Sequence, residues 1–296
     1  MNDPVPENPK VSVIINCHNS EEFLHQAIES VFCQTYQNWE IIFWDNASSD
    51  KSAEIAKSFG DRIRYYFNPV LTNLGTARNS ALNMAEGELV GFLDCDDLWY
   101  SHKLEEQVSL FIKNPDLGFV YSKASVIDSK DKKLDEIPSL KILPSGKIFD
   151  QMCKKNFVPF PSVLCSLKKL IEIGGVPTSL KTSTDYAIFL SLCHKFEVAS
   201  LQHPTCSYRV HAKMNSHSNR VQSIVENILI VENFLPLKAA YDGLKYHFIT
   251  LIFESFREKN MTELRFTLFR KYFDIKIFCM RVINGIFGKG NSIYRK

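Results

Sequence analysis

The sequence lacks a long apolar run and lacks paired cysteines at metal-binding spacing, although 8 of its 296 residues are cysteines. No apolar stretch reaches the length of about 18 residues that a membrane-spanning helix needs. The first ten residues are polar, without the apolar centre of a signal peptide. No two cysteines stand at C-x-x-C spacing, so the sequence predicts a cytoplasmic chain with buried, reduced thiols.

A strong net charge and the usual phosphate-binding patterns are also missing. The formal net charge is +2, which argues against a nucleic-acid partner. Neither G-x-G-x-x-G nor G-x-x-x-x-G-K-[ST] occurs, so the usual sequence motifs of dinucleotide-dependent hydride transfer and of ATP hydrolysis are absent. Apolar residues make up 45% of the chain and charged residues 23%, which is typical of a folded protein with a sizeable core.

The first hundred residues alternate between apolar runs and amphipathic stretches. Residues 11–16 form a β-branched run, typical of a strand buried on both faces. Asn19 offers a helix N-cap, with Glu22 three residues later as in a capping box. Further strands are expected at 40–44, 62–67 and 89–93, and further helices at 52–59 and 76–85. This alternation predicts an α/β fold with a Rossmann-like, mainly parallel sheet and helices on both faces.

The chain divides into three parts by pattern. Residues 1–100 carry the strand–helix alternation. Residues 101–218 mix short strands with two clear helical stretches, at 102–113 and 186–195. Residues 219–296 are helical throughout and form a C-terminal extension.

Polar groups follow three of the expected strands. They are Cys17-His18-Asn19, Asp45-Asn46 and Asp94-Cys95-Asp96-Asp97. Ligands bind outside the carboxyl ends of the strands in an open parallel sheet, so the fold should bring the three groups to one edge. The last group holds three carboxylates within four residues, and such charges repel unless a cation neutralises them. The sequence therefore predicts Mg²⁺ or Mn²⁺ here, and the alternative is a solvated acidic turn.

A second candidate ligand site opens the helix that follows Asn73. Gly75 would let the backbone approach a ligand closely, and a helix N-terminus favours anions. Arg78, on the first turn, could reach a phosphate or the acidic cluster, although an arginine in this position is commonly just solvated.

These segments together resemble the family 2 glycosyltransferases. The resemblance rests on residues 11–16, 28–36, 45–50, 73–79 and 92–97, which occur in the family's order and spacing. It is strong over residues 10–120, weaker to about residue 218, and missing thereafter. It implies the GT-A fold, inversion at the anomeric carbon, and a nucleotide-sugar donor used with Mg²⁺ or Mn²⁺.

The resemblance also implies roles for particular residues. Asp45 would contact the nucleobase, expected to be uracil, and Asp185 would be the catalytic base. Asp96, Asp97 and His211 would lie at the metal, with His211 in a Y-R-x-H segment; an idle surface histidine is the alternative. The expected nucleotide-sugar site consists of Asn16, His18, Asn19, Asp45, Gly75, Arg78, Asp94 and Cys95.

The sequence departs from the family pattern at two positions. Asn46 stands where many relatives have a second aspartate, so it keeps hydrogen-bonding capacity but carries no charge. Thr184 replaces the glutamate that usually precedes the base, whereas Asp185 keeps the carboxylate. The expected acceptor is a glycan or polyprenyl-linked saccharide, in surface polysaccharide assembly. The motifs leave the sugar, the acceptor and the oligomeric state open.

Two other functions are alternatives to this hexosyltransferase-type, metal-dependent enzyme. A haloacid-dehalogenase-like hydrolase also uses D-x-D at a strand end, but it needs an aspartate after its first strand, where this chain has Cys17-His18-Asn19. A non-catalytic nucleotide or glycan-binding protein would be expected to lack Asp185 or the acidic cluster.

The C-terminal tail has a composition of its own. Residues 264–296 contain eight basic residues against one acid, interleaved with apolar residues. Such a stretch is too charged to span a bilayer, but it is suited to lie on an anionic membrane surface. The sequence thus predicts peripheral attachment to the inner face of the membrane; the alternative is a helix packed on the catalytic domain or on a second copy.

Overall fold

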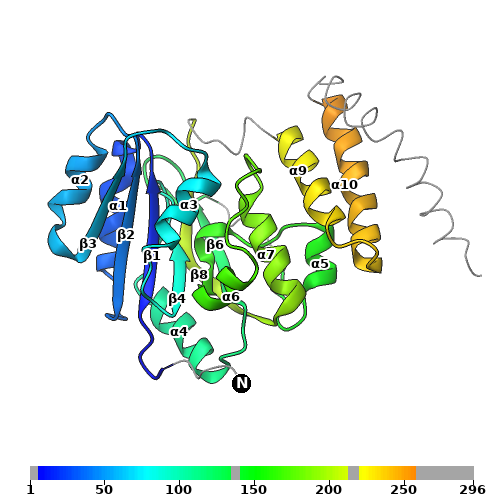
Figure 1. The fold of residues 1–296 in the computed structure, drawn as a ribbon, viewed down its shortest axis with the longest axis horizontal. Helices are drawn as coiled ribbons and strands as arrows, with labels where there is room; N and C mark the ends of the chain where they lie inside the picture. The colour runs from blue at the N-terminus through cyan, green and yellow to red at the C-terminus, as the bar shows by residue number, and fades with distance from the viewer. Residues whose placement is uncertain (1–5, 135–140, 213–219, 258–296) are drawn as a thin grey trace, which may run out of the picture.

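The computed structural model describes residues 6–134, 141–212 and 220–257, which are built around one curled sheet (Figure 1). Across the sheet, the strands lie in the order β3 (Ile63–Asn68), β2 (Trp39–Asn46), β1 (Val11–Cys17), β4 (Leu89–Phe92), β7 (Leu164–Ser166), β6 (Phe119–Ile127), β8 (Val198–Arg209) and β5 (Leu98–Trp99). The first four pair in parallel, as do β6 and β8. Strand β7 is antiparallel to both of its neighbours, and β5 is antiparallel to β8. The predicted α/β fold is confirmed.

Helices cover both faces of the sheet. One face carries α1 (Glu21–Phe32), α2 (Ser52–Ser58) and α4 (Lys103–Lys113), and the other carries α3 (Leu74–Leu82), α6 (Leu167–Glu172) and α7 (Thr184–Lys195). Strand β1 is mostly apolar because both of its faces are covered, and Ser12 and Asn16 are its polar residues. Val13 and Ile15 join the apolar cluster on the first face, Ile14 joins the cluster on the second, and all three are at most 1% exposed.

The expected elements are present, with small shifts at their ends. The helix expected over 76–85 begins at Leu74, because the Asn73 side chain caps it by accepting from Thr76 N at 2.9 Å. The N-cap expected at Asn19 is wrong. Helix α1 begins at Glu21, and the Asn19 side chain instead accepts a hydrogen bond from Ser49 N at 2.8 Å.

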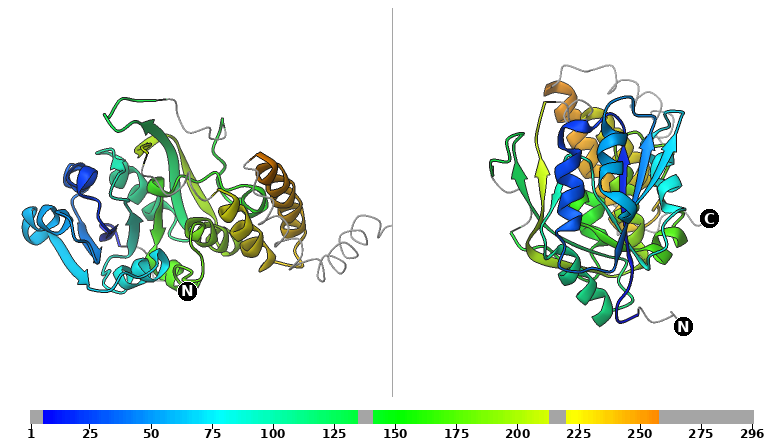
Figure 2. Two further views of the ribbon diagram at one scale, coloured as in Figure 1. Left: turned by 90° about the horizontal axis from the view of Figure 1, so that it is seen from above. Right: turned by 90° about the vertical axis from the view of Figure 1, so that its left-hand side faces the viewer.

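The C-terminal helices pack on α5 and α7. Helices α9 (Arg220–Glu232) and α10 (Lys238–Arg257) lie side by side, and α10 packs on α5 (Phe149–Lys154) (Figures 1 and 2). A side chain at Gly243 would meet Cys153 O at 2.3 Å, so this contact requires glycine. The described part of the extension therefore belongs to the same apolar cluster as α7.

Residues 258–296, and with them the basic tail, lie outside the described residues. Among the helices that the structure describes, none combines the length and the apolar character that crossing a bilayer requires.

Candidate active site

The carboxyl ends of β1, β2 and β4 meet at one edge of the sheet, as the strand pattern predicts. Strand pairing places Cys17 beside Asp45. Leu93, just after β4, donates its backbone N–H to Ile14 O of β1, and the acidic residues 94–97 follow directly. The three polar groups of the sequence therefore converge.

Arg78 links the acidic cluster to the segment that carries the expected base. Its guanidinium donates to Asp94 Oδ1 at 3.2 Å and to Thr184 Oγ1 at 2.9 Å, and it lies 4.1 Å from the centre of the Phe160 ring. Arg78 is only 5% exposed, so a merely solvated arginine is excluded. Enclosure by protein raises the pKa of Asp94, Arg78 opposes this shift, and the Asp96 charge adds to it.

The other two carboxylates of the cluster contact the end of β8. Asp96 Oδ2 lies 2.9 Å from His211 Nε2, and the Asp96 side chain is 34% exposed. Asp97 is buried, and its Oδ1 accepts from Arg209 N at 2.9 Å. Arg209 is itself fully buried and donates from Nε to Asp96 O at 2.8 Å. The Y-R-x-H segment thus holds the acidic cluster through both its arginine and its histidine.

The side chains at this edge are chemically suited to bind a divalent cation such as Mg²⁺ or Mn²⁺. Asp94 and Asp96 are partly exposed carboxylates, and the His211 imidazole lies against Asp96. Within the described residues, the buried Asp97 Oδ2 has no hydrogen-bond partner. Burial and the neighbouring carboxylates raise the pKa of Asp97 well above its usual range, and a bound cation would relieve this repulsion.

Asp185 lies in the first turn of α7, on a different element from the cluster, and its charge contributes to the raised pKa of Asp94. Its Oδ2 accepts a hydrogen bond from Asn156 Nδ2 at 3.2 Å. Enclosure by protein raises the pKa of Asp185, while the Tyr186 N–H and the Arg78 charge partly oppose the shift. A general base works best when its pKa lies near the operating pH, so a raised pKa suits a carboxylate that has to accept a proton.

A buried glutamate of α9 holds the loop that leads to Asp185. The Glu226 carboxylate accepts hydrogen bonds from the backbone N–H groups of Lys181, Thr182 and Ser183, each at 2.9 Å. Glu226 is only 3% exposed. The described C-terminal extension therefore contributes directly to the geometry of the expected base.

Several residues of the expected nucleotide-sugar site lie at the ends of β1 and β2 or just beyond them. Asp45 is fully buried, and its oxygens accept from Ser48 N at 2.8 Å and from Tyr65 Oη at 2.6 Å. His18 Nδ1 lies 2.9 Å from Asn46 O. The buried Asn16 Nδ2 has no hydrogen-bond partner among the described residues.

Gly75 and Cys95 have protein neighbours that explain their residue types. A side chain at Gly75 would meet Pro177 O at 2.2 Å. The backbone at Gly75 therefore lies close to the loop before α7. The Cys95 thiol donates to Asn16 O at 3.3 Å. It also hydrogen-bonds to Cys17, which lowers the Cys17 pKa to about 7. Donor contacts of Gly75 and Cys95 stay predictions.

Sequence reasoning missed Asn156, Glu226 and the role of Arg209. Glu226 stands out as an acidic residue in an apolar helical stretch, which indicates a buried carboxylate. Its partners cannot be identified from the sequence, because they lie more than 40 residues away. Asn156 had no signal of its own. Arg209 belongs to the Y-R-x-H pattern, in which the family resemblance implies a role for His211 alone.

Comparison with known proteins defines the class of protein. The sequence profile described as "Glycosyl transferase family 2" matches residues 12–167. The chain is 29% identical over 255 residues to "UDP-Glc:alpha-D-GlcNAc-diphosphoundecaprenol beta-1,3-glucosyltransferase WfgD" of Escherichia coli, covering 84% of this chain and 97% of WfgD. It covers only 31% and 35% of two longer uncharacterized glycosyltransferases from Rickettsia.

Solved structures share the fold. S. aureus TarS 1–349, solved in complex with UDP-GlcNAc, has a TM-score of 0.68 and 18% identity, covering 85% of this chain and 76% of TarS. The mannosyltransferase PcManGT of Pyrobaculum calidifontis, solved with GDP-Man and Mn²⁺, has a TM-score of 0.59 and 13% identity, covering 97% of this chain and 90% of PcManGT.

The profile match spans more than half of the chain, and the structural neighbours share the GT-A fold. The chain belongs to glycosyl transferase family 2. This membership decides against the haloacid-dehalogenase alternative.

Proposed function

We propose that the chain is an inverting, metal-dependent enzyme that moves a hexose from a UDP-sugar to a lipid-linked saccharide in surface polysaccharide assembly. The observation that carries the proposal is the position of Asp185: Arg78 contacts both Asp94 of the acidic cluster and Thr184, the residue before Asp185. The UDP-GlcNAc complex of TarS supports the donor class. The name of WfgD, with its diphosphoundecaprenol-linked substrate, supports the acceptor class.

The residues divide the chemistry between two sides of the site. Asp185 removes the proton of the acceptor hydroxyl while that oxygen bonds to the anomeric carbon, and the bond to the nucleoside diphosphate breaks. Attack from the side opposite the leaving group inverts the anomeric centre. Arg78, held against Asp94 and Thr184, fixes the distance between the two sides and places a positive charge between them.

Asp96, Asp97 and His211 are the residues that would hold Mg²⁺ or Mn²⁺, and Asp94 would contact the nucleotide-sugar. The cation, when bound, stabilises the negative charge of the departing diphosphate, so no general acid is required. Arg209 keeps this side in place, because it donates to Asp96 O and to the Asp97 carboxylate.

The test is a panel of radiolabelled nucleotide-sugars offered with a short-chain polyprenyl-diphosphate saccharide. We expect transfer from a UDP-sugar in Mn²⁺ or Mg²⁺ and none in excess chelator. The anomeric configuration of the product, read by NMR coupling, should be opposite to that of the donor. A retained configuration or unchanged turnover in chelator would overturn the corresponding part of the proposal, and nucleotide binding without transfer or hydrolysis would support a binding protein instead.

Residues 264–296 are proposed to hold the enzyme on an anionic membrane beside such an acceptor. Each of the eight basic residues contributes about 1 kcal/mol near an anionic leaflet. In co-sedimentation, the full chain should pellet with anionic vesicles and not with neutral ones. A chain ending at Asn260 should stay in solution with both. Unchanged vesicle binding by a truncated chain, or its unfolding, would assign the tail a structural role.

A further inference from the structure

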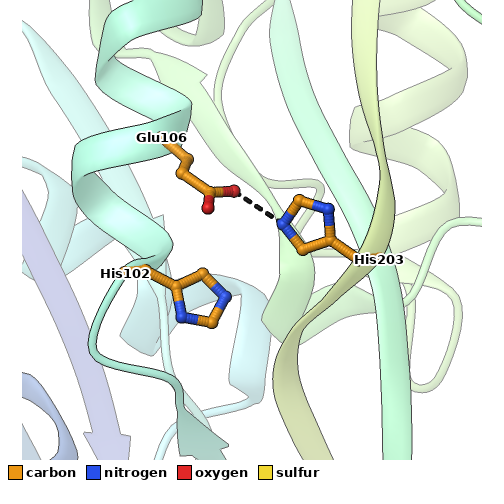
Figure 3. Close-up of side chains that lie close together, drawn as sticks. All are labelled: His102, Glu106 and His203. Atoms are coloured by element: carbon orange, nitrogen blue, oxygen red, sulfur yellow. Dashed lines mark hydrogen bonds and ion pairs between the residues drawn. The ribbon is translucent and has the colours of Figure 1, made fainter.

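A second group of metal-ligating side chains lies outside the active site. His102 stands at the start of α4, Glu106 lies one turn later, and His203 comes from β8 (Figure 3). Glu106 Oε2 is 2.7 Å from His203 Nε2, and one ligand atom from each of the three residues lies within 4.8 Å of the others. The close-up shows the carboxylate and both rings directed toward a common point.

Local structure explains why the three side chains meet. His102 and Glu106 are four residues apart, so they share one face of α4. His203 lies at an irregularity of β8: Ser122 of β6 pairs with Leu201, but the next residue of β6 pairs with Pro204. The extra residues of β8 form a bulge, and bulges commonly redirect a side chain at functional sites.

We propose that His102, Glu106 and His203 bind a transition-metal ion of the zinc class, which clamps α4 to the bulged part of β8. Two imidazoles and one carboxylate suit Zn²⁺, which takes a fourth ligand from water, whereas Mg²⁺ prefers oxygen ligands alone. Tetrahedral Zn²⁺ places its ligand atoms about 3.3 Å apart. The His203 side chain is 51% exposed and that of Glu106 37%, so both have room to rotate toward this spacing.

The clamp would act on the strand pair that carries the active-site acids. Strand β5 directly follows Asp97, and Leu98 and Trp99 pair with Ser207 and Cys206 of β8. His102 follows β5, and β8 continues from His203 to Arg209. The metal site and the acidic cluster therefore lie toward opposite ends of this pair. The expected role of the ion is to stabilise the pair, with no part in the transfer reaction.

Zinc binding to the full chain tests the proposal. Calorimetry with ZnCl₂ is done in excess Mg²⁺, which occupies the acidic cluster, and with a non-thiol reductant. We expect His203→Gln and Glu106→Gln each to weaken one Zn²⁺ site at least tenfold. Gln at position 106 can still hydrogen-bond to His203, so its effect separates a metal site from an ion pair. The matched control is His25→Gln, which removes the exposed histidine of another His–Glu pair, on α1.

A direct location of the ion completes the test. An anomalous difference map from crystals soaked in ZnCl₂ should show a peak between His102, Glu106 and His203. His102→Gln offers a further variant, because within the described part of the chain the His102 ring contacts the rings of Tyr100 and His203 and makes no hydrogen bond. Wild-type zinc affinity in all three variants, or a map without a peak there, would show that the group is an ordinary ion pair.

Discussion

The two sides of the proposed active site are built in different ways. On the donor side, Asp45 and Asp94 stand where parallel strands end, and the sheet itself brings them together. On the base side, Asp185 depends on residues from remote parts of the chain: Asn156 contacts its carboxylate, and Glu226 holds its loop. The donor side is thus a property of the sheet, whereas the base side is a property of tertiary packing.

This difference predicts which changes affect turnover alone and which affect binding. The donor side should determine affinity for the nucleotide-sugar. The base side should determine the rate of transfer once the donor is bound. Separate measurements of donor Kd and of kcat for variants on each side test this division.

The largest effect is expected for Asp185→Asn. Loss of a general base lowers kcat by about two to four orders of magnitude. Donor Kd, measured by calorimetry, should stay at the wild-type value, because Asp185 is not among the donor-side residues. Asp150→Asn, at an exposed carboxylate on α5, is the control and should leave both values unchanged. An equal loss of donor affinity in Asp185→Asn would place Asp185 on the donor side and break the comparison.

Asp96→Ala, in contrast to Asp185→Asn, should change the binding of the nucleotide. Without this carboxylate, we expect Mn²⁺ to stop strengthening UDP binding, so that the affinities with and without Mn²⁺ become equal. Titration of UDP in Mn²⁺ and in chelator gives both values. Asp61→Asn, in the exposed turn before β3, is the control. If Mn²⁺ strengthens UDP binding as much in Asp96→Ala as in the wild type, Asp96 does not hold the metal.

Glu226→Gln tests the remote support of the base. An amide cannot replace the charged acceptor of three backbone N–H groups, and hydrogen bonds to charged groups contribute about 1.5–3 kcal/mol. We expect a lower free energy of unfolding in urea and a kcat reduced about tenfold, with unchanged donor Kd. Glu232→Gln, at the end of the same helix, is the comparison variant. A stability loss with normal kcat would make Glu226 purely structural.

How far the sequence predicts each side follows from the same difference. A strand end is visible in the hydropathy pattern, so the positions of residues 94–97 and Asp45 could be inferred before their contacts were known. Arg78 was placed near the acids, but its bond to Thr184 joins residues 106 positions apart. The hydrogen bonds from Asn156 and to Glu226 likewise depend on packing of helices and loops, for which the sequence carries no periodic signal.

The smallest effect is expected from pH, through His247 of α10. Burial lowers the pKa of His247 to about 4, from an ordinary value of 6.5. Between these values the unfolded chain binds a proton that the folded chain does not, so this residue makes stability fall as the pH drops from about 6.5 to 4. The slope is at most about 1.4 kcal/mol per pH unit.

His247 packs where the C-terminal helix meets the base side. Its Nε2 lies 3.1 Å from Cys153 O and 3.3 Å from the hydroxyl of Tyr186, the residue after Asp185. Thermal unfolding between pH 7 and 4.5 should show a shallower acid decline for His247→Gln than for the wild type, and His25→Gln, at an exposed site, should follow the wild type. At pH 5, the backbone amides of α7 and α10 should exchange hydrogen faster, relative to pH 7, than those of β1 and β2. Parallel pH curves for His247→Gln and wild type would show that protonation of His247 does not weaken the base side.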